Sequence, residues 1–287
     1  MLLDRAVVER IVAAALAEDL AWGDITTESL IGPDQTCVGR LVAKEEGVLA
    51  GIEVAALTFA AVDGAVRVEV LVPDGGRVER GTVVATIRGP VAGVLKAERV
   101  ALNFLQRLSG VATATAAYVA AIAGTSARII DTRKTTPGLR VLEKYAVRVG
   151  GGFNHRFCLS DGVLIKDNHL AALRAAGLGL RDAVAMARER VPHTTRVEVE
   201  VESLAEVEEA LAAGADAILL DNMRPPEMRE AVKLIAGRAI TEASGGINLS
   251  TVRAVAETGV DLISAGALTH SVRALDISLE LGMSEER

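Results

Sequence analysis

The chemically richest stretch of this sequence is a basic segment within an acidic chain. The formal net charge is -7, yet between Arg99 and Lys166 ten lysines and arginines stand against only three acids. Guanidinium groups bind carboxylates and phosphates through paired hydrogen bonds. The segment therefore predicts a small anionic ligand. DNA and other polyanions are disfavoured, because binding them requires a net basic face.

The basic residues of this segment divide into two groups by their spacing. Arg140, Lys144 and Arg148 recur at helical spacing, which is typical of a solvated helix face. The others suit a ligand with two carboxylates and several phosphates, although a histidine such as His155, taken alone, is more often structural. This ligand-binding group comprises Arg99, Arg133, Lys134, His155, Arg156 and Lys166.

Three glutamates, Glu198, Glu200 and Glu202, alternate with valines and therefore share one face of a predicted strand. An edge strand with solvated glutamates would show the same alternation. The other interpretation is a Mg²⁺ site that Glu200 forms with Asp221, because Mg²⁺ prefers oxygen ligands and keeps several waters beside a pyrophosphate.

Two glycine turns follow the last two predicted strands. The backbone N–H groups of residues 244–246 (Ser-Gly-Gly) lie between a strand and a helix, where they can converge on a phosphate at the positive end of that helix. Gly266 offers a second such turn. One glycine turn is weak evidence, but phosphate sites in α/β barrels recur at the last two strand-helix loops.

The elements that must position these residues follow a regular pattern. Strand-like segments alternate with helical ones, which predicts successive βα units and a parallel sheet. Six strands are too few for an eight-stranded barrel, so we expect a smaller or incomplete α/β barrel, with ligands at the carboxyl ends of the strands. The predicted strands are residues 128–131, 163–166, 196–201, 217–221, 239–243 and 262–265.

We expect an α+β sandwich domain over residues 1–110, before a barrel domain over residues 111–273 that carries the site. A C-terminal helix, residues 274–287, is expected to pack back on the first domain. Within the first domain the pattern predicts an amphipathic helix at 1–20, a turn-rich link at 23–27, strands at 38–43, 48–50, 66–72 and 81–88, a helix at 54–61, and a long helix at 96–123.

The remaining sequence signals are mostly negative. Residues 1–20 carry interrupting charges, so they predict neither a signal peptide nor a membrane span. Cys37 and Cys158 are too few for a disulfide framework, and we expect a reducing cytoplasm. Cys158 lies in an apolar stretch and is expected to be buried and inert. No P-loop, Rossmann fingerprint or HExxH zinc motif is present.

The ordered motifs resemble one known family, quinolinate phosphoribosyltransferase, across essentially the whole chain. The motifs are GDITT (23–27), AER (97–99), LSGVAT (108–113), DTRKT (131–135), GGFNHR (151–156), LIKDNH (164–169), EVEV (198–201), LDN (220–222), SGG (244–246) and GALTH (266–270). One departure is Cys158, which stands where the family would have a glycine. It puts the conformation of that loop in doubt, but not the cationic residues.

The resemblance implies phosphoribosyl transfer from phosphoribosyl pyrophosphate to the ring nitrogen of quinolinate, with loss of one carboxylate as CO₂. The products would be nicotinate mononucleotide and pyrophosphate, in NAD biosynthesis, with Mg²⁺ as cofactor. It implies catalytic roles for Lys134, Lys166, Glu200 and Asp221, the last two also as metal ligands. It implies substrate binding by Arg99, Thr132, Arg133, Lys134, His155, Arg156, Lys166, Ser244, Gly245, Gly246, Ala265, Gly266, Ala267 and His270.

The resemblance also implies a homodimer, because Arg99 in this family reaches the site of the partner subunit; a hexamer of dimers is left open. One rival function is phosphoribosyl transfer to nicotinate or another pyridine or pyrrole acid. Two carboxylates on the substrate explain the dense cation cluster better than one. A second rival is a non-catalytic phosphosugar-binding barrel, against which the carboxylates Glu200 and Asp221 beside the phosphate turns argue.

Overall fold

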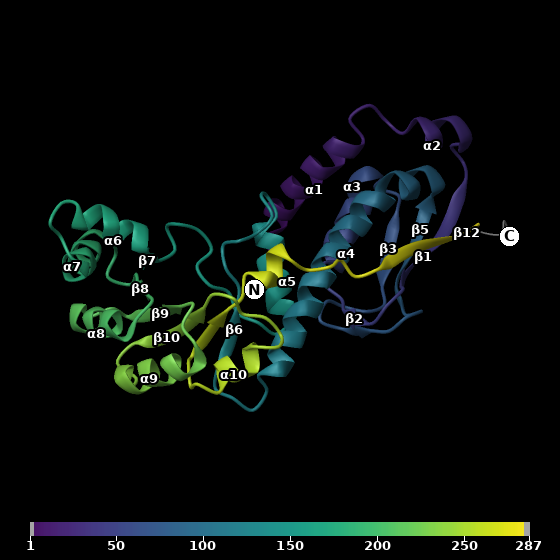
Figure 1. Cartoon of the computed structure of the whole chain (residues 1–287). Helices are drawn as coiled ribbons and strands as arrows, with labels where there is room; N and C mark the ends of the chain where they lie inside the picture. The colour runs from purple at the N-terminus through teal and green to yellow at the C-terminus, as the bar shows by residue number, and fades with distance from the viewer. Residues whose placement is uncertain (1–2, 284–287) are drawn as a thin grey trace. The chain divides into compact units, whose positions relative to one another are not determined.

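The structure is a computed structural model that describes residues 3–283. They form two compact units, and the chain passes between them more than once (Figure 1). Of the described residues, the first unit comprises 3–116, 135–151 and 271–283, and the second comprises Ala117–Lys134 and Gly152–His270. No helix within residues 3–283 is long and apolar enough to cross a membrane.

The first unit is built on a four-stranded antiparallel sheet in the order β12-β1-β5-β3. Its strands are β1 (Thr36–Ala43), β3 (Arg67–Val70), β5 (Val83–Pro90) and β12 (Ile277–Met283). A two-stranded sheet pairs β2 (Gly47–Val48) with β4 (Arg77–Val78). The helices are α1 (Arg5–Asp19), α2 (Ile25–Leu30), α3 (Ile52–Val62), the long α4 (Val91–Ala121), whose last residues belong to the second unit, and α5 (Arg140–Val149).

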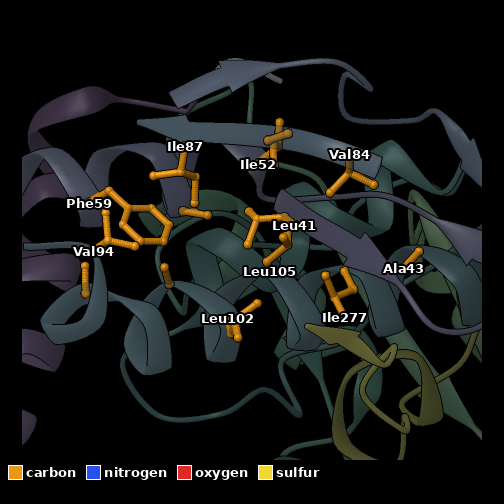
Figure 2. Close-up of a cluster of buried hydrophobic side chains, with 14 of the residues drawn as sticks. Leu41, Ala43, Ile52, Phe59, Val84, Ile87, Val94, Leu102, Leu105 and Ile277 are labelled. Atoms are coloured by element: carbon orange, nitrogen blue, oxygen red, sulfur yellow. The ribbon is translucent and has the colours of Figure 1, made fainter. Parts of the chain in front are cut away.

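The core of the first unit lies between this sheet and helices α3 and α4 (Figure 2). Leu41 and Ile87 from the sheet and Phe59 and Leu105 from the helices are all fully buried. The alternation of buried and exposed positions along β1 sends one face of the strand into this cluster. The helix α5 is tied to the same unit by Tyr145, whose hydroxyl donates to Asp74 at 2.7 Å.

Two predicted elements of the first unit are wrong. The link after Gly23 is the helix α2, because the Asp24 carboxylate accepts from the backbone N–H groups of Thr26 and Thr27 and so caps a helix N-terminus. The predicted C-terminal helix is the strand β12, which pairs with β1 from Cys37↔Met283 to Ala43↔Ile277. Residues 284–287 of that predicted helix lie outside the described residues.

The second unit contains the predicted parallel sheet, and all six strands are confirmed. The sheet order is β6-β11-β10-β9-β8-β7, and each neighbouring pair runs parallel. The strands are β6 (Arg128–Ile130), β7 (Val163–Ile165), β8 (Val197–Val201), β9 (Ala217–Asp221), β10 (Ile240–Ser244) and β11 (Leu262–Ser264). The helices are α6 (Asp167–Arg174), α7 (Leu180–Arg190), α8 (Leu204–Ala213), α9 (Pro225–Ile235), α10 (Val252–Ala256) and α11 (Ala267–His270).

The helices of this unit pack along the sheet in chain order. Helix α7 contacts β7 and β8, α8 contacts β8, α9 contacts β10, and α10 contacts β11. At the β6 end, Phe153 continues the pairing: its N–H donates to Ile129 O at 2.8 Å, and its carbonyl accepts from Asp131 N at 3.1 Å. The segment after Gly152 is thereby held beside the end of β6.

Candidate active site

The second unit holds a cavity of about 540 Å³ at the carboxyl ends of its strands, where parallel α/β sheets bind ligands. The sequence-predicted residues form most of its wall. Those that line it are Thr132, Arg133, Lys134, His155, Arg156, Lys166, Glu200, Asp221, Ser244, Gly245 and Gly246. The remaining lining residues are Leu164, Leu219, Asn222, Glu242 and Ser264.

A fully buried carboxylate fixes one side of the cavity. Asp131, directly after β6, accepts from Asn154 Nδ2 at 2.6 Å and from the backbone N–H of His155 at 2.9 Å. These two bonds attach the glycine-rich connection to the end of β6. The polar pair His155-Arg156 is therefore held beside Arg133, although the two segments are more than 20 residues apart in the chain.

The two arginines repel one another in this cavity. Burial lowers the pKa of Arg156, and the nearby positive charge of Arg133 lowers it further, while Glu198 and Glu200 oppose the shift. A guanidinium group stays charged at neutral pH even so. An anion bound between the two side chains would relieve the repulsion, so this wall of the cavity has the charge to hold one.

The cavity also carries two carboxylates from neighbouring strands. Glu200 projects from β8 and forms an ion pair with the ammonium group of Lys166, which follows β7. Asp221 ends β9 and accepts from Asn222 Nδ2 at 2.7 Å. Strand β8 pairs with both β7 and β9, so the edge-strand interpretation of its glutamates is wrong. Glu202 lies beyond the strand and is exposed.

His155, Glu198 and Glu242 form a further cluster, in which Glu242 is buried and the other two are partly buried. The backbone N–H of Arg156 donates to His155 Nδ1 at 2.7 Å, so the imidazole carries its hydrogen on Nε2. That Nε2 lies 3.1 Å from Glu198 Oε2 and 3.4 Å from Glu242 Oε2. Burial, followed by the charge of Glu198, raises the pKa of Glu242 well above its usual value. The shift favours the protonated form of Glu242 beside Glu198.

The glycine turn after β10 differs from its predicted setting. Gly245 and Gly246 both have positive φ, +90° and +63°, which non-glycine side chains rarely adopt. The following helix, α10, begins only at Val252 and has five residues. The turn is therefore not at a helix N-terminus, and its own N–H groups, not a helix dipole, would face a phosphate.

The residues expected after β11 lie beside Lys134, outside the cavity lining. A Cβ added at Gly266 would lie 3.0 Å from His270 Nε2 and 3.1 Å from Lys134 Cδ. Thr269 Oγ1 donates to the backbone carbonyl of Lys134 at 2.7 Å. Ala265 is buried, and Ala267 opens the short helix α11. This loop therefore supports the segment that presents Lys134.

Comparison with known families agrees with this arrangement. The model of the quinolinate phosphoribosyl transferase C-terminal domain matches residues 111–280, and that of the N-terminal domain matches residues 24–109. The chain belongs to the quinolinate phosphoribosyltransferase family. The family resemblance drawn from the motifs is thereby confirmed.

Relatives in this family are similar along nearly their whole length. A Bacillus subtilis protein named probable nicotinate-nucleotide pyrophosphorylase (carboxylating) is 46% identical over 269 residues, which cover 94% of this chain and 91% of that protein. The nicotinate-nucleotide pyrophosphorylase (carboxylating) of Mycobacterium leprae is 46% identical over 276 residues, 94% of this chain and 95% of that one. The crystal structure of NadC from Streptococcus pyogenes matches with a TM-score of 0.94 at 45% identity, covering 99% of this chain and all of the other.

Three residues outside the cavity also bear on the family expectations. Arg99 is exposed on α4 in the first unit, whereas the cavity lining comes entirely from the second. Cys158 is exposed, contrary to its expected burial, with Sγ 3.1 Å from Ser160 Oγ. Lys144 is fully buried, so the solvated helix face predicted for it is wrong: helical spacing alone does not tell which face of α5 is buried.

Sequence reasoning missed Glu242, Ser264 and Asn222 as cavity residues. Glu242 had a usable signal, because it stands two residues before Ser244 on the same strand and so on the same face. The signal of Asn222 is its place directly after Asp221 at a strand end. Neither position reveals its spatial neighbours, which come from other strands and loops.

Proposed function

We propose that this chain catalyses phosphoribosyl transfer from phosphoribosyl pyrophosphate to quinolinate, with decarboxylation to nicotinate mononucleotide, in NAD biosynthesis. One observation supports this most directly. A single cavity carries four basic side chains, three acidic ones and a turn with two positive-φ glycines, which suits a dicarboxylate and a phosphorylated sugar together. The basic residues are Arg133, Lys134, Arg156 and Lys166.

The cationic wall suits the two carboxylates of quinolinate. Burial, and then the nearby charge of Arg133, lower the pKa of Arg156, and each of the two arginines offers a planar fork for a carboxylate. In this proposal His155 holds the backbone of Arg156 through Nδ1, and Thr132 holds Lys134 N through a 3.0 Å hydrogen bond. A substrate with one carboxylate would leave part of this charge unneutralised.

The reaction needs no enzyme nucleophile. The lone pair of the pyridine nitrogen forms a bond to the anomeric carbon while the bond from that carbon to pyrophosphate breaks. Positive charge develops on the ribose, and the carboxylates Glu200 and Asp221 stabilise it. The carbon–carbon bond to the 2-carboxylate then breaks, its electrons stay on the ring beside the cationic nitrogen, CO₂ leaves, and the ring carbon gains a proton. Lys166 stabilises this charge distribution from the end of β7.

The residues present fit a Mg²⁺ ion. Glu200 and Asp221 offer carboxylate oxygens from adjacent strands, and Mg²⁺ typically binds one or two carboxylates together with substrate phosphates and water. When bound, the ion would neutralise charge on the leaving pyrophosphate. Lys166 pairs with Glu200 in this structure. This ion pair orients the Glu200 carboxylate, which lines the cavity.

We further propose a homodimer in which the exposed Arg99 of each subunit completes the site of the other, with a hexamer of dimers as the larger candidate assembly. The reaction is assigned to the cytoplasm, since both cysteines are free thiols that suit a reducing compartment.

The decisive experiment follows carboxyl-labelled quinolinate. Incubation with phosphoribosyl pyrophosphate and MgCl₂ should release labelled CO₂ and form nicotinate mononucleotide and pyrophosphate in equal amounts. Turnover of nicotinate in preference to quinolinate would instead favour a related phosphoribosyltransferase. No pyrophosphate release with either acid at saturation would favour a non-catalytic phosphosugar-binding barrel.

A further inference from the structure

Asn222, directly after β9, has an unusual backbone conformation. Among the described residues, only Asn222 (φ +54°) and Ala236 (φ +49°) are non-glycine residues with positive φ. Such a conformation persists where the surrounding structure fixes it, and asparagine tolerates it better than most residues. Glycine would adopt it at no steric cost. The presence of an asparagine therefore directs attention to its side chain.

Asn222 contacts both Asp221 and the 244–246 turn, through its side chain and its backbone. Its Nδ2 donates to Asp221 Oδ2 at 2.7 Å. Its backbone N–H donates to the carbonyl of Ser244 at 2.9 Å, across from β9 to β10. Its Oδ1 lies against Gly245, where an added Cβ would be only 2.2 Å away. One residue thus touches the carboxylate and the glycine turn.

We propose that Asn222 is a positioning residue that fixes the Asp221 carboxylate and the 244–246 turn relative to one another. This inference rests on the proposed function, in which these two groups receive the phosphates of the ribosyl donor and its Mg²⁺. Asp221 and Ser244 end neighbouring strands and are paired in register. The Asp221 carboxylate and the glycines at 245 and 246 lie beyond that backbone pairing, and the Asn222 side chain contacts both of them. Groups held in advance cost less ordering free energy on binding.

The same contact explains Gly245. Its positive φ disfavours a side chain, and the space where a Cβ would stand is taken by the Asn222 side-chain amide at 2.2 Å and by the Asn222 backbone N at 2.8 Å. Gly246, the next residue, also has positive φ but nothing within 4 Å of its Cβ position. Gly245 therefore differs from Gly246 in that Asn222 lies where its side chain would be.

The test compares Asn222→Gly and Asn222→Ala with a matched control, Ala236→Gly. Asn222→Gly keeps the backbone conformation accessible and removes the amide. We expect its Tm to stay within a few degrees of the unmodified chain, with a Kd for phosphoribosyl pyrophosphate in MgCl₂ weakened on the order of tenfold or more, since a hydrogen bond to a charged group is lost. The MgCl₂ concentration needed for half-maximal binding should rise. The Kd for quinolinate, which faces the cationic wall, should not change.

Ala236→Gly relieves the same kind of backbone conformation at the end of α9, away from the cavity, and should leave both dissociation constants unchanged. If Asn222→Gly binds the donor as tightly as the unmodified chain, the proposal is wrong. It is equally wrong if only Asn222→Ala loses affinity, because strain and not the amide would then matter. Turnover of quinolinate by the unmodified chain is measured separately, so its failure would overturn the proposed function and not the role of Asn222.

Discussion

At the scale of single residues, Glu242 is the least expected part of the cavity. It is 1% exposed, and the charged and titratable groups that face it are His155, Glu198 and Lys166. Burial raises its pKa well above the usual 4.5, with Glu198 adding to the shift. The folded chain therefore keeps the Glu242 proton to a higher pH than the unfolded chain, which loses it near pH 4.5. Stability should fall as pH rises from that value until the raised folded-state pKa is passed.

This sign gives a prediction for Glu242→Gln. Glutamine is neutral at every pH and can donate to Glu198 as the protonated acid does. The variant therefore lacks the contribution of Glu242 to the pH dependence of stability. Its stability advantage over the unmodified chain should therefore grow as the pH rises above 4.5, by at most about 1.4 kcal/mol per pH unit. Urea unfolding at a series of pH values measures the difference.

A second buried glutamate provides the control. Glu143 is fully buried and accepts from Arg107 Nη2 at 2.7 Å, so it is a paired carboxylate. Glu143→Gln removes the charge opposite Arg107 and should lower stability at every pH tested. A constant difference between Glu242→Gln and the unmodified chain across the pH range would contradict the assignment of a neutral Glu242.

Replacing Arg133 tests whether the arginines of the cavity bind the substrate. Arg133→Ala removes one guanidinium fork from the cavity, and quinolinate affinity should fall at least a hundredfold, about 3 kcal/mol, as charged hydrogen bonds are lost. Titration calorimetry measures the binding, and circular dichroism checks that the fold is intact. Arg188→Ala is the control, because Arg188 pairs with Asp216 near the protein surface instead of in the cavity. Unchanged quinolinate affinity in Arg133→Ala would refute its role.

The sequence predicted most cavity residues because polar groups that end parallel strands must converge. It could not predict Glu242 as an acid, since its proton depends on Glu198 from β8 and His155 from the loop beside β6. It also misjudged Lys144, because spacing along a helix does not tell which face is covered by the rest of the unit. What was missed in each case is a contact between residues distant in sequence.

At the scale of elements, the main error was the C-terminal segment. Leu275, Ile277, Leu279 and Leu281 alternate with polar residues, and a period of two is the pattern of a strand. Whether such a segment pairs depends on a free strand edge, and β1 supplies one in the first unit. The parallel strands were predictable because each is a short apolar run between helices, and their pairing follows from the βα succession.

The strand β12 yields a stability prediction. Ile277 is 1% exposed and belongs to the core cluster shown in Figure 2, so Ile277→Ala should destabilise the chain by about 2–4 kcal/mol. Glu280 on the same strand points to solvent and pairs with Lys44. Glu280→Gln should cost less than about 0.5 kcal/mol. Equal losses in thermal or denaturant unfolding would mean that β12 does not supply core packing.

At the scale of the whole molecule, the proposed dimer gives a prediction that is tested by mixing two variant subunits. If Arg99 serves the site of the partner subunit, Arg99→Ala and Arg133→Ala damage different parts of each site, and each homodimer should be inactive. In a mixed dimer one site combines an intact Arg133 with an intact partner arginine, while the other lacks both. Random exchange makes half of the dimers mixed, so about a quarter of all sites should recover.

The assay is turnover after unfolding the two variants together and refolding them, with each refolded alone as control. If Arg99 acted within its own subunit, every site would keep one defect and mixing would restore nothing.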